Sequence, residues 1–94
     1  MKTFADIKRR LTVGTTLTMI RHDWQKGPGG LIGKPRKITE SNTVGIEFEG
    51  GSWLHYTNAK CIVPTGENSF KVILNPEAPE QIMEYVIGDK HAVT

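Results

Sequence analysis

Between residues 43 and 56 the chain carries the feature that most constrains its fold. Val44, Ile46 and Phe48 alternate with polar residues and glycine, which is the period-two pattern of a strand with one buried face. A Gly-Gly pair follows and suits a tight turn, because glycine adopts positive φ without steric cost. The next segment is rich in aromatic residues, which favour strands. We therefore expect a β-hairpin whose three alternating apolar residues face a core.

Other short segments of β-branched and apolar residues flank this hairpin, and Gly, Pro and Asn turns separate them. They predict strands at residues 15–22, 34–40, 59–63 and 69–74. Leu17, Leu54 and Phe70 should join the core of the hairpin. Five or six antiparallel strands at such close intervals are typical of a small barrel. For residues 15–74 we expect a mainly β fold, an SH3-like barrel.

The first eleven residues predict a short helix. Thr3 is a favoured N-cap, and Asp6 lies three residues later, where its side chain completes a capping box. Phe4, Ile7 and Leu11 recur at helical spacing. We expect a helix at residues 3–11 that packs on the barrel through this apolar stripe.

Residues 79–87 fit two structures. Pro79 and Glu80 suit the first turn of a helix, but the segment fits an edge strand equally well, and we favour the helix. The apolar residues at helical spacing are Ile82, Met83, Val86 and Ile87. They offer either a cover for one open end of the barrel or the contact surface of a homo-oligomer, with Tyr85 at its rim. A dimer or a dimer of dimers would be the first expectation.

Length and composition describe a single domain over residues 1–94. A chain of 94 residues buries about 60–70% of its unfolded surface. Its one cysteine, Cys61, excludes an internal disulfide and a cysteine-based zinc site within one chain. No stretch approaches the roughly 20 apolar residues that a membrane span needs. We expect a soluble protein of the reducing cytoplasm, without a membrane partner.

The charges are unevenly distributed along the chain. Residues 1–41 hold nine Lys or Arg and three acidic residues, whereas residues 42–94 hold three lysines and seven acidic residues. A basic region that stays together on the surface would favour an anionic partner. His22, His55 and His91 are too scattered to predict a metal site. We therefore expect a binding protein, not an enzyme, with no metal or cofactor.

A Gly- and Pro-rich loop is expected at residues 23–30. It is longer than the usual hairpin connection of about two to five residues, and long loops in small domains often carry binding residues. Trp24 lies in this loop, and an exposed tryptophan usually covers something. Two roles stay open for Trp24: a plug for one end of the barrel, and a contact to a ligand.

Several short motifs follow one another in an order known from another group of proteins. They are Pro35-Arg36-Lys37-Ile38, Ser41-Asn42, Ser52-Trp53-Leu54-His55-Tyr56, Ala59-Lys60 and Phe70-Lys71-Val72. In this layout residues 1–74 resemble short phage-encoded SH3-like β-barrel proteins, although the Ala-Lys order departs from the more usual Lys-Ala. The resemblance implies a viral protein made in the bacterial cytoplasm, of a kind that often acts against host defences.

Two function classes are consistent with these residues. The first is sequestration of a phosphate-bearing ligand such as a cyclic-nucleotide immune signal, or binding of a nucleic acid, because cationic side chains hold phosphates and flat rings stack on bases. The candidate ligand-binding residues are Arg21, His22, Trp24, Lys34, Arg36, Lys37, Trp53 and Tyr56. The second is a protein-interaction module that inhibits a host defence enzyme through exposed aromatic and charged side chains.

Overall fold

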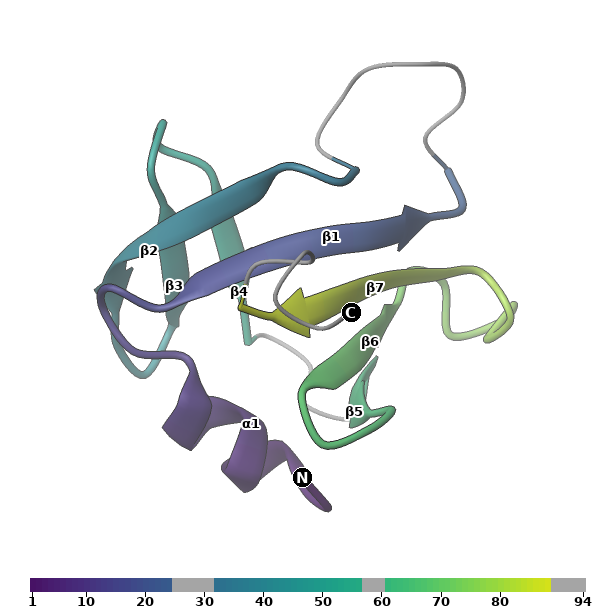
Figure 1. The fold of residues 1–94 in the computed structure, drawn as a ribbon. Coiled ribbons are helices and arrows are strands. Elements are labelled where there is room, and N and C mark those ends of the chain that lie inside the picture. The colour runs from purple at the N-terminus through teal and green to yellow at the C-terminus, as the bar shows by residue number, and fades with distance from the viewer. Residues whose placement is uncertain (25–31, 57–60, 89–94) are drawn as a thin grey trace.

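The computed structural model describes residues 1–24, 32–56 and 61–88, whose strands form one coiled antiparallel sheet (Figure 1). The elements are α1 (Phe4–Arg10), β1 (Thr16–His22), β2 (Pro35–Ser41), β3 (Gly45–Phe48), β4 (Trp53–His55), β5 (Ile62–Pro64), β6 (Ser69–Ile73) and β7 (Ile82–Ile87). The sheet order is β4-β3-β2-β1-β7-β6-β5. The predicted mainly β, barrel-like fold with a short N-terminal helix is confirmed, with seven strands in the described residues where five or six were expected.

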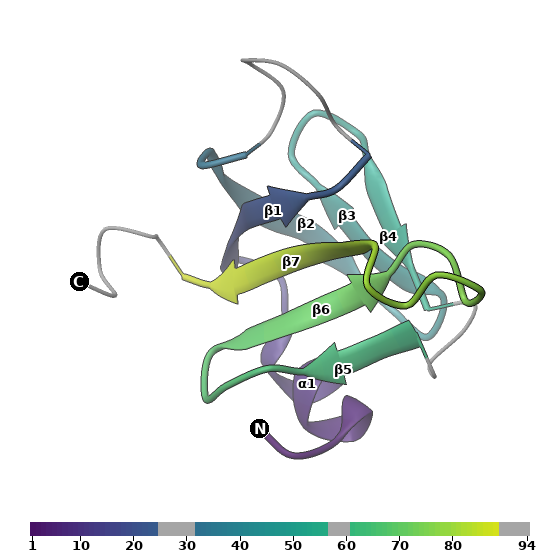
Figure 2. The ribbon, with the colours of Figure 1, turned by 90° about the vertical axis from the view of Figure 1, so that its right-hand side faces the viewer.

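The N-terminal helix begins as its sequence predicts. The Thr3 hydroxyl oxygen accepts a hydrogen bond from the Asp6 amide at 3.2 Å. The Asp6 carboxylate in turn accepts one from the Thr3 amide at 3.1 Å, which completes the capping box. Ile7 and Leu11 are fully buried. The helix therefore packs against the barrel through its apolar stripe, at the end next to β5 (Figure 2).

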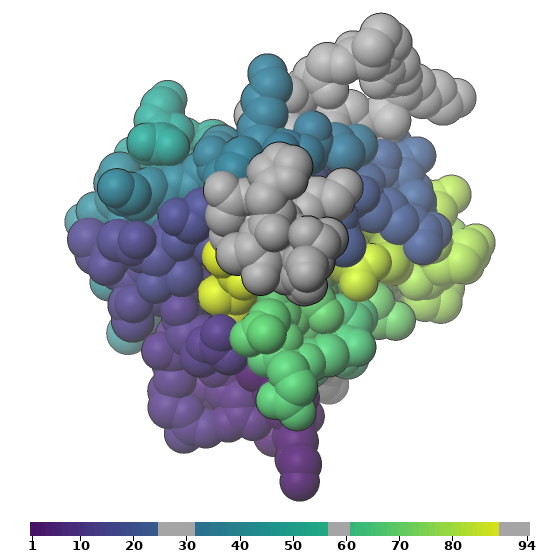
Figure 3. Space-filling model, viewed as in Figure 1, coloured from purple at the N-terminus to yellow at the C-terminus, as the bar shows by residue number. Residues whose placement is uncertain are grey.

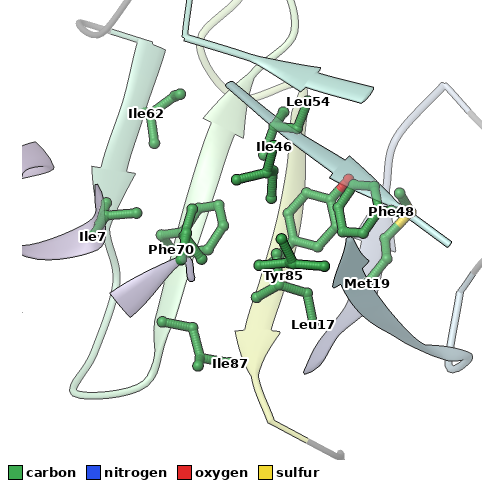
Figure 4. Packing of buried hydrophobic residues seen from close by; sticks show 12 residues of the cluster. Ile7, Leu17, Met19, Ile46, Phe48, Leu54, Ile62, Phe70, Tyr85 and Ile87 are labelled. Carbon is green, nitrogen blue, oxygen red and sulfur yellow. The ribbon is translucent and has the colours of Figure 1, made fainter. Parts of the chain in front are cut away.

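A continuous apolar core fills the coil of the sheet (Figure 4). Tyr85 lies between two phenylalanines, with its ring centroid 5.4 Å from that of Phe70 and 6.2 Å from that of Phe48. The predicted core residues Leu17, Ile46, Phe48, Leu54 and Phe70 are all buried. For these five residues, alternation along the strands correctly predicted the inner face of the sheet.

Val44 is the exception, and its predicted burial is wrong: it is 58% exposed. It precedes β3 and belongs to the turn after β2. There the Asn42 side-chain oxygen accepts a hydrogen bond from the Val44 amide at 2.8 Å, as in an Asx turn. The turn ends the alternation one residue before the strand begins, so the Val44 side chain lies in solvent.

The helix favoured for residues 79–87 is also wrong, because Ile82–Ile87 forms β7. This strand is not an edge strand either, since it pairs with β1 on one side and with β6 on the other. Two partner strands satisfy its backbone groups, which outweighs the weak helical spacing of its apolar residues. Pro79 and Glu80 instead belong to the turn before β7, where the Gln81 amide bonds the Ala78 carbonyl oxygen at 2.9 Å.

This correction removes the predicted oligomer surface. Ile82 and Ile87 are each only 8% exposed and belong to the core of the barrel, and Met83 and Val86 are half-buried. Tyr85, expected at the rim of that surface, is buried between the phenylalanines. The four apolar residues therefore stabilise the monomer, and an oligomer would need another surface.

Candidate binding surface

The eight predicted ligand-binding residues lie in three separate places. Arg21, His22 and Trp24 lie at and just beyond the end of β1; Lys34, Arg36 and Lys37 lie at the start of β2; Trp53 and Tyr56 lie on and just after β4. The described part of the chain forms no enclosed pocket. Most of the predicted loop, residues 25–31, lies outside the described residues, as do residues 57–60 and 89–94.

At the end of β1, the Arg21 charge is neutralised within the chain. A β-bulge between Met19 and Arg21 changes the phase of the strand, and Arg21 points to solvent. Its guanidinium donates to both oxygens of Asp23, at 2.7 and 2.9 Å. Asp23 also accepts a hydrogen bond from the Ile82 amide at 2.9 Å. The hydrogen bond from Arg21, followed by that from Ile82, lowers the pKa of Asp23.

Trp24 does not plug the barrel. Its side chain is 54% exposed, and its indole N–H donates to the Gln81 side-chain oxygen at 2.7 Å. Its amide donates to Nδ1 of His22 at 3.3 Å. The indole is therefore held on the surface at the junction of β1 and β7. Whether it contacts a ligand stays a prediction.

The three basic residues at the start of β2 have two kinds of surroundings. The Arg36 guanidinium carbon lies 4.0 Å from the centroid of the Phe48 ring, and one N–H of the group donates to the Ser52 hydroxyl at 2.7 Å. This cation–π contact makes Arg36 part of the packing over the core. Lys34 and Lys37 are exposed. Arg36 is thus placed for structure, while the two lysines are free to meet an anion in solution.

Trp53 and Tyr56 do not belong to one site, because they face opposite sides of the sheet. Tyr56 points inward, where its ring packs edge-on against Phe4 at 5.3 Å and Lys8 Nζ lies 5.7 Å from the ring centroid. Desolvation of its hydroxyl raises the pKa of Tyr56 to about 12. Tyr56 therefore anchors α1 to the barrel and offers no open ring face for a base.

Trp53 points outward and forms a pair that the sequence reasoning did not include. Its ring stacks on that of His55, with the centroids 5.7 Å apart and the planes 6° from parallel. Leu54, between them, is buried, which fixes the two rings on the solvent side of β4. The signal was present in the sequence, since residues two apart on a strand share a face.

Gly45 lets β4 approach β3 at this point. A Cβ on Gly45 would collide with the backbone carbonyl oxygen of Leu54 and lie 2.9 Å from the Cα of His55. Only glycine fits a contact this close between two backbones. The position of His55, and hence of its stack with Trp53, therefore depends on Gly45. In the sequence, Gly45 is recognisable only as a member of the alternating strand.

Acidic residues lie on the strands beside the aromatic pair. Glu47 lies directly across from Trp53 in the β3–β4 ladder, and Glu40 lies across from Glu47 in the β2–β3 ladder. Glu49 lies farther along, with a carboxylate oxygen 3.3 Å from the Lys37 amide. We call this face of the β2–β3–β4 sheet the aromatic–acidic surface; its members are Glu40, Glu47, Glu49, Trp53 and His55. Its β3–β4 turn projects from the body of the molecule (Figure 3).

Two further findings concern metal ions and membranes. Within residues 1–24, 32–56 and 61–88, no three His, Cys, Asp or Glu side chains gather in a way that would hold a metal ion. In the same ranges no helix is long and apolar enough to cross a membrane. The aromatic–acidic surface offers stacking, van der Waals contact and negative charge.

Comparison with known proteins adds no relative to this picture. No protein-family model, no curated protein and no solved structure matches the chain. The resemblance to short phage-encoded barrel proteins therefore stays a prediction made from the order of its sequence motifs.

Proposed function

We propose that this protein is a non-enzymatic interaction module that binds a partner protein through its aromatic–acidic surface. The observation that supports the proposal most directly is the exposed, parallel stack of Trp53 on His55 at the edge of the sheet. Tryptophan is among the residues that most often dominate binding energy when a partner covers it. The stack also restricts the rotamers of both rings before binding, which lowers the entropic cost of association.

The acidic neighbours favour a protein over a nucleotide at this surface. Glu47 lies directly across from Trp53 in the ladder, so a phosphate brought beside a base stacked on Trp53 would meet like charge. Lysine or arginine side chains of a protein would meet opposite charge there. Among the partners that the sequence resemblance implies, the protein is a host defence enzyme of the bacterial cytoplasm.

The test compares two pairs of exposed side chains. Trp53→Ala with His55→Ala removes the stack, and Val13→Ala with Val44→Ala truncates two valines that are 64% and 58% exposed and are not members of the aromatic–acidic surface. Proteins retained by each immobilised variant from a lysate of its natural host are quantified by mass spectrometry, and the affinity of the purified partner is then measured. We expect the stack variant to lose at least about tenfold in affinity and the valine variant to bind like the wild type. Equal retention by both variants would contradict the proposal.

A second proposal is the binding of a phosphate-bearing ligand, such as a cyclic nucleotide or a nucleic acid, near the start of β2. One observation favours it: Lys34 and Lys37 are exposed, and neither takes part in a salt bridge within the described residues. Calorimetry with cyclic nucleotides and single-stranded oligonucleotides tests it. The affinity should fall as salt rises and should fall again in Lys34→Ala with Lys37→Ala. Binding that ignores salt would count against this proposal.

The second proposal includes a homo-oligomer. A barrel of this size is filled by its own side chains, so a pocket for a nucleotide would form more easily between copies than within one. Light scattering at micromolar concentration, with and without the ligand, measures the mass in solution. A monomeric mass under both conditions would contradict a pocket shared between copies, while leaving the protein-interaction proposal intact.

A further inference from the structure

The hydrogen bonds of the β3–β4 hairpin decide which backbone groups of β4 remain open. The Phe48 amide donates to the Ser52 carbonyl oxygen and the Tyr56 amide donates to that of Val44, both at 2.8 Å. In an antiparallel ladder the bonded pairs alternate with non-bonded pairs. The pairs Glu47–Trp53 and Gly45–His55 are therefore non-bonded, and the amides and carbonyls of Trp53 and His55 point away from β3.

These backbone groups lie at an end of the sheet. β4 is the terminal strand of the sheet order, and among the turn, loop and cap hydrogen bonds of the described residues none involves the backbone amide or carbonyl of Trp53 or His55. Each of the two residues offers one donor and one acceptor to an incoming strand. An exposed edge of this kind is a template for the addition of a strand from another chain.

The side chains beside this edge select the charge of such a strand. Residues paired with Trp53 and His55 would place their side chains on the outer face, with Cβ atoms about 5 Å from those of Trp53 and His55. Glu40 and Glu47 lie one behind the other beyond Trp53. An arginine or lysine over the Trp53 ring would gain a cation–π contact and favourable charge. Lys37 is the basic neighbour on this face, but it lies farther back on β2, next to Glu49.

We propose that the partner binds by adding an extended segment to β4 as a further strand, with arginine or lysine at alternate positions facing Trp53 and His55. The inference rests on the proposed function, because it specifies how a protein binds the aromatic–acidic surface. It commits to backbone pairing and to a basic partner segment, neither of which the proposed function requires.

A synthetic probe tests the pairing directly. The probe is the peptide acetyl-Thr-Arg-Thr-Arg-Thr-Arg-Thr-amide, and its matched control carries glutamate in place of each arginine. Titration is followed by two-dimensional amide NMR of the labelled protein and by calorimetry. We expect the arginine peptide to shift the amide signals of Trp53 and His55 most strongly. The glutamate peptide should not bind.

Two variants of one residue separate the backbone from the ring. His55→Ala removes the imidazole only, whereas His55→Pro also removes the N–H that points away from β3. Because that N–H makes no bond within the hairpin, proline is compatible with this edge position. We expect His55→Pro to bind the arginine peptide about tenfold more weakly than His55→Ala, the equivalent of one lost hydrogen bond. Both variants should melt at similar temperatures.

A peptide N-methylated at its arginine amides repeats the test on the unaltered protein and covers the case in which His55→Pro unfolds. It should not bind. Binding of this peptide, equal binding of the glutamate peptide, or no binding of the arginine peptide would overturn strand addition. If the natural partner is lost with the Trp53→Ala and His55→Ala pair but retained by His55→Pro, the proposed function stands and strand addition fails. If neither variant affects the partner, both fail.

Discussion

The protein presents two tryptophans at its surface, and their surroundings differ. At the end of β1, the Trp24 indole N–H is bonded to Gln81 and the neighbouring Arg21 is paired with Asp23. On β4, Trp53 makes a stack with His55 at an edge of the sheet, and the acidic residues beside it take part in no salt bridge within the described residues. Exposure alone therefore does not identify a binding site. The backbone groups and charges that the fold leaves uncompensated are the better guide.

The difference is also one of the support beneath each tryptophan. The β1 end is held by side-chain hydrogen bonds to β7 and to the turn before it. The hairpin that carries Trp53 rests instead on buried apolar residues and on the close approach of Gly45 to β4. Substitutions in the two regions should distinguish stabilisation by side-chain hydrogen bonds from stabilisation by apolar packing. Their expected effects on stability decrease from Phe48→Ala to Asp23→Asn.

The largest effect is expected from Phe48→Ala. Phe48 is 2% exposed, stacks near Tyr85 and carries the Arg36 guanidinium on its ring. The cavity should lower the free energy of unfolding by about 3–5 kcal/mol, enough to unfold a marginally stable domain. Denaturant titration measures the change. The control is Val44→Ala in the adjoining turn, which should cost less than about 0.5 kcal/mol. A Phe48→Ala protein that unfolds like the wild type would show that the Phe48 ring does not stabilise this region.

Gly45→Ala should follow in size and should act on the hairpin alone. The added Cβ collides with the Leu54 carbonyl oxygen, so β4 must move away from β3. We expect a loss of about 1–3 kcal/mol and a disturbed Trp53–His55 stack, seen in the NMR signals of both rings. The control is Gly50→Asn, where an added Cβ meets no atom within 4 Å and asparagine tolerates the positive φ of 95°. Unchanged ring signals in Gly45→Ala would show that the glycine does not position the stack.

A smaller effect should distinguish the two tryptophans directly. Gln81→Ala removes the hydrogen bond to the Trp24 indole and should cost about 0.5–1.5 kcal/mol. In a Trp24→Phe background the same substitution should cost almost nothing, because the bond is already absent. His55→Ala, which removes the partner of Trp53, should lower stability by less than about 0.5 kcal/mol while weakening partner binding. Thermal and chemical unfolding of these variants measure the coupling energy between Trp24 and Gln81. Additive losses of stability from the two substitutions would rule out the Trp24–Gln81 hydrogen bond.

The smallest effect concerns pH at the β1 end. Hydrogen bonds from Arg21 and Ile82 lower the pKa of Asp23 in the folded state below its ordinary value of 3.8. The unfolded state then binds more protons, so this contribution to stability is present above about pH 4 and is lost as pH falls through the folded pKa. Asp23→Asn should flatten the pH dependence of stability in that acidic range. The stability of Trp53→Ala should follow the wild-type pH profile, and a wild-type slope in Asp23→Asn would contradict the assignment.

Local patterns in the sequence were sufficient for much of this structure. The alternation at Ile46 and Phe48 and the capping box at Thr3 each depend on neighbours a few residues away, so the sequence predicts them directly. The same parity rule places Trp53 and His55 on one face of β4 and Tyr56 on the other. The prediction of a single ligand site containing both Trp53 and Tyr56 could have been corrected from this rule alone.

The sequence by itself determined the extended character of β1 to β6, the start of the helix and the inward direction of Leu17, Ile46, Phe48, Leu54 and Phe70, because these follow from local sterics and side-chain periodicity. Only the tertiary structure decided the rest. β7 is a strand because β1 and β6 satisfy both of its edges, and Arg21 is neutralised because Asp23 is also held by Ile82. β4 is an edge because the sheet order ends there. Each of these depends on contacts between residues far apart in the chain, whose strength no local pattern encodes.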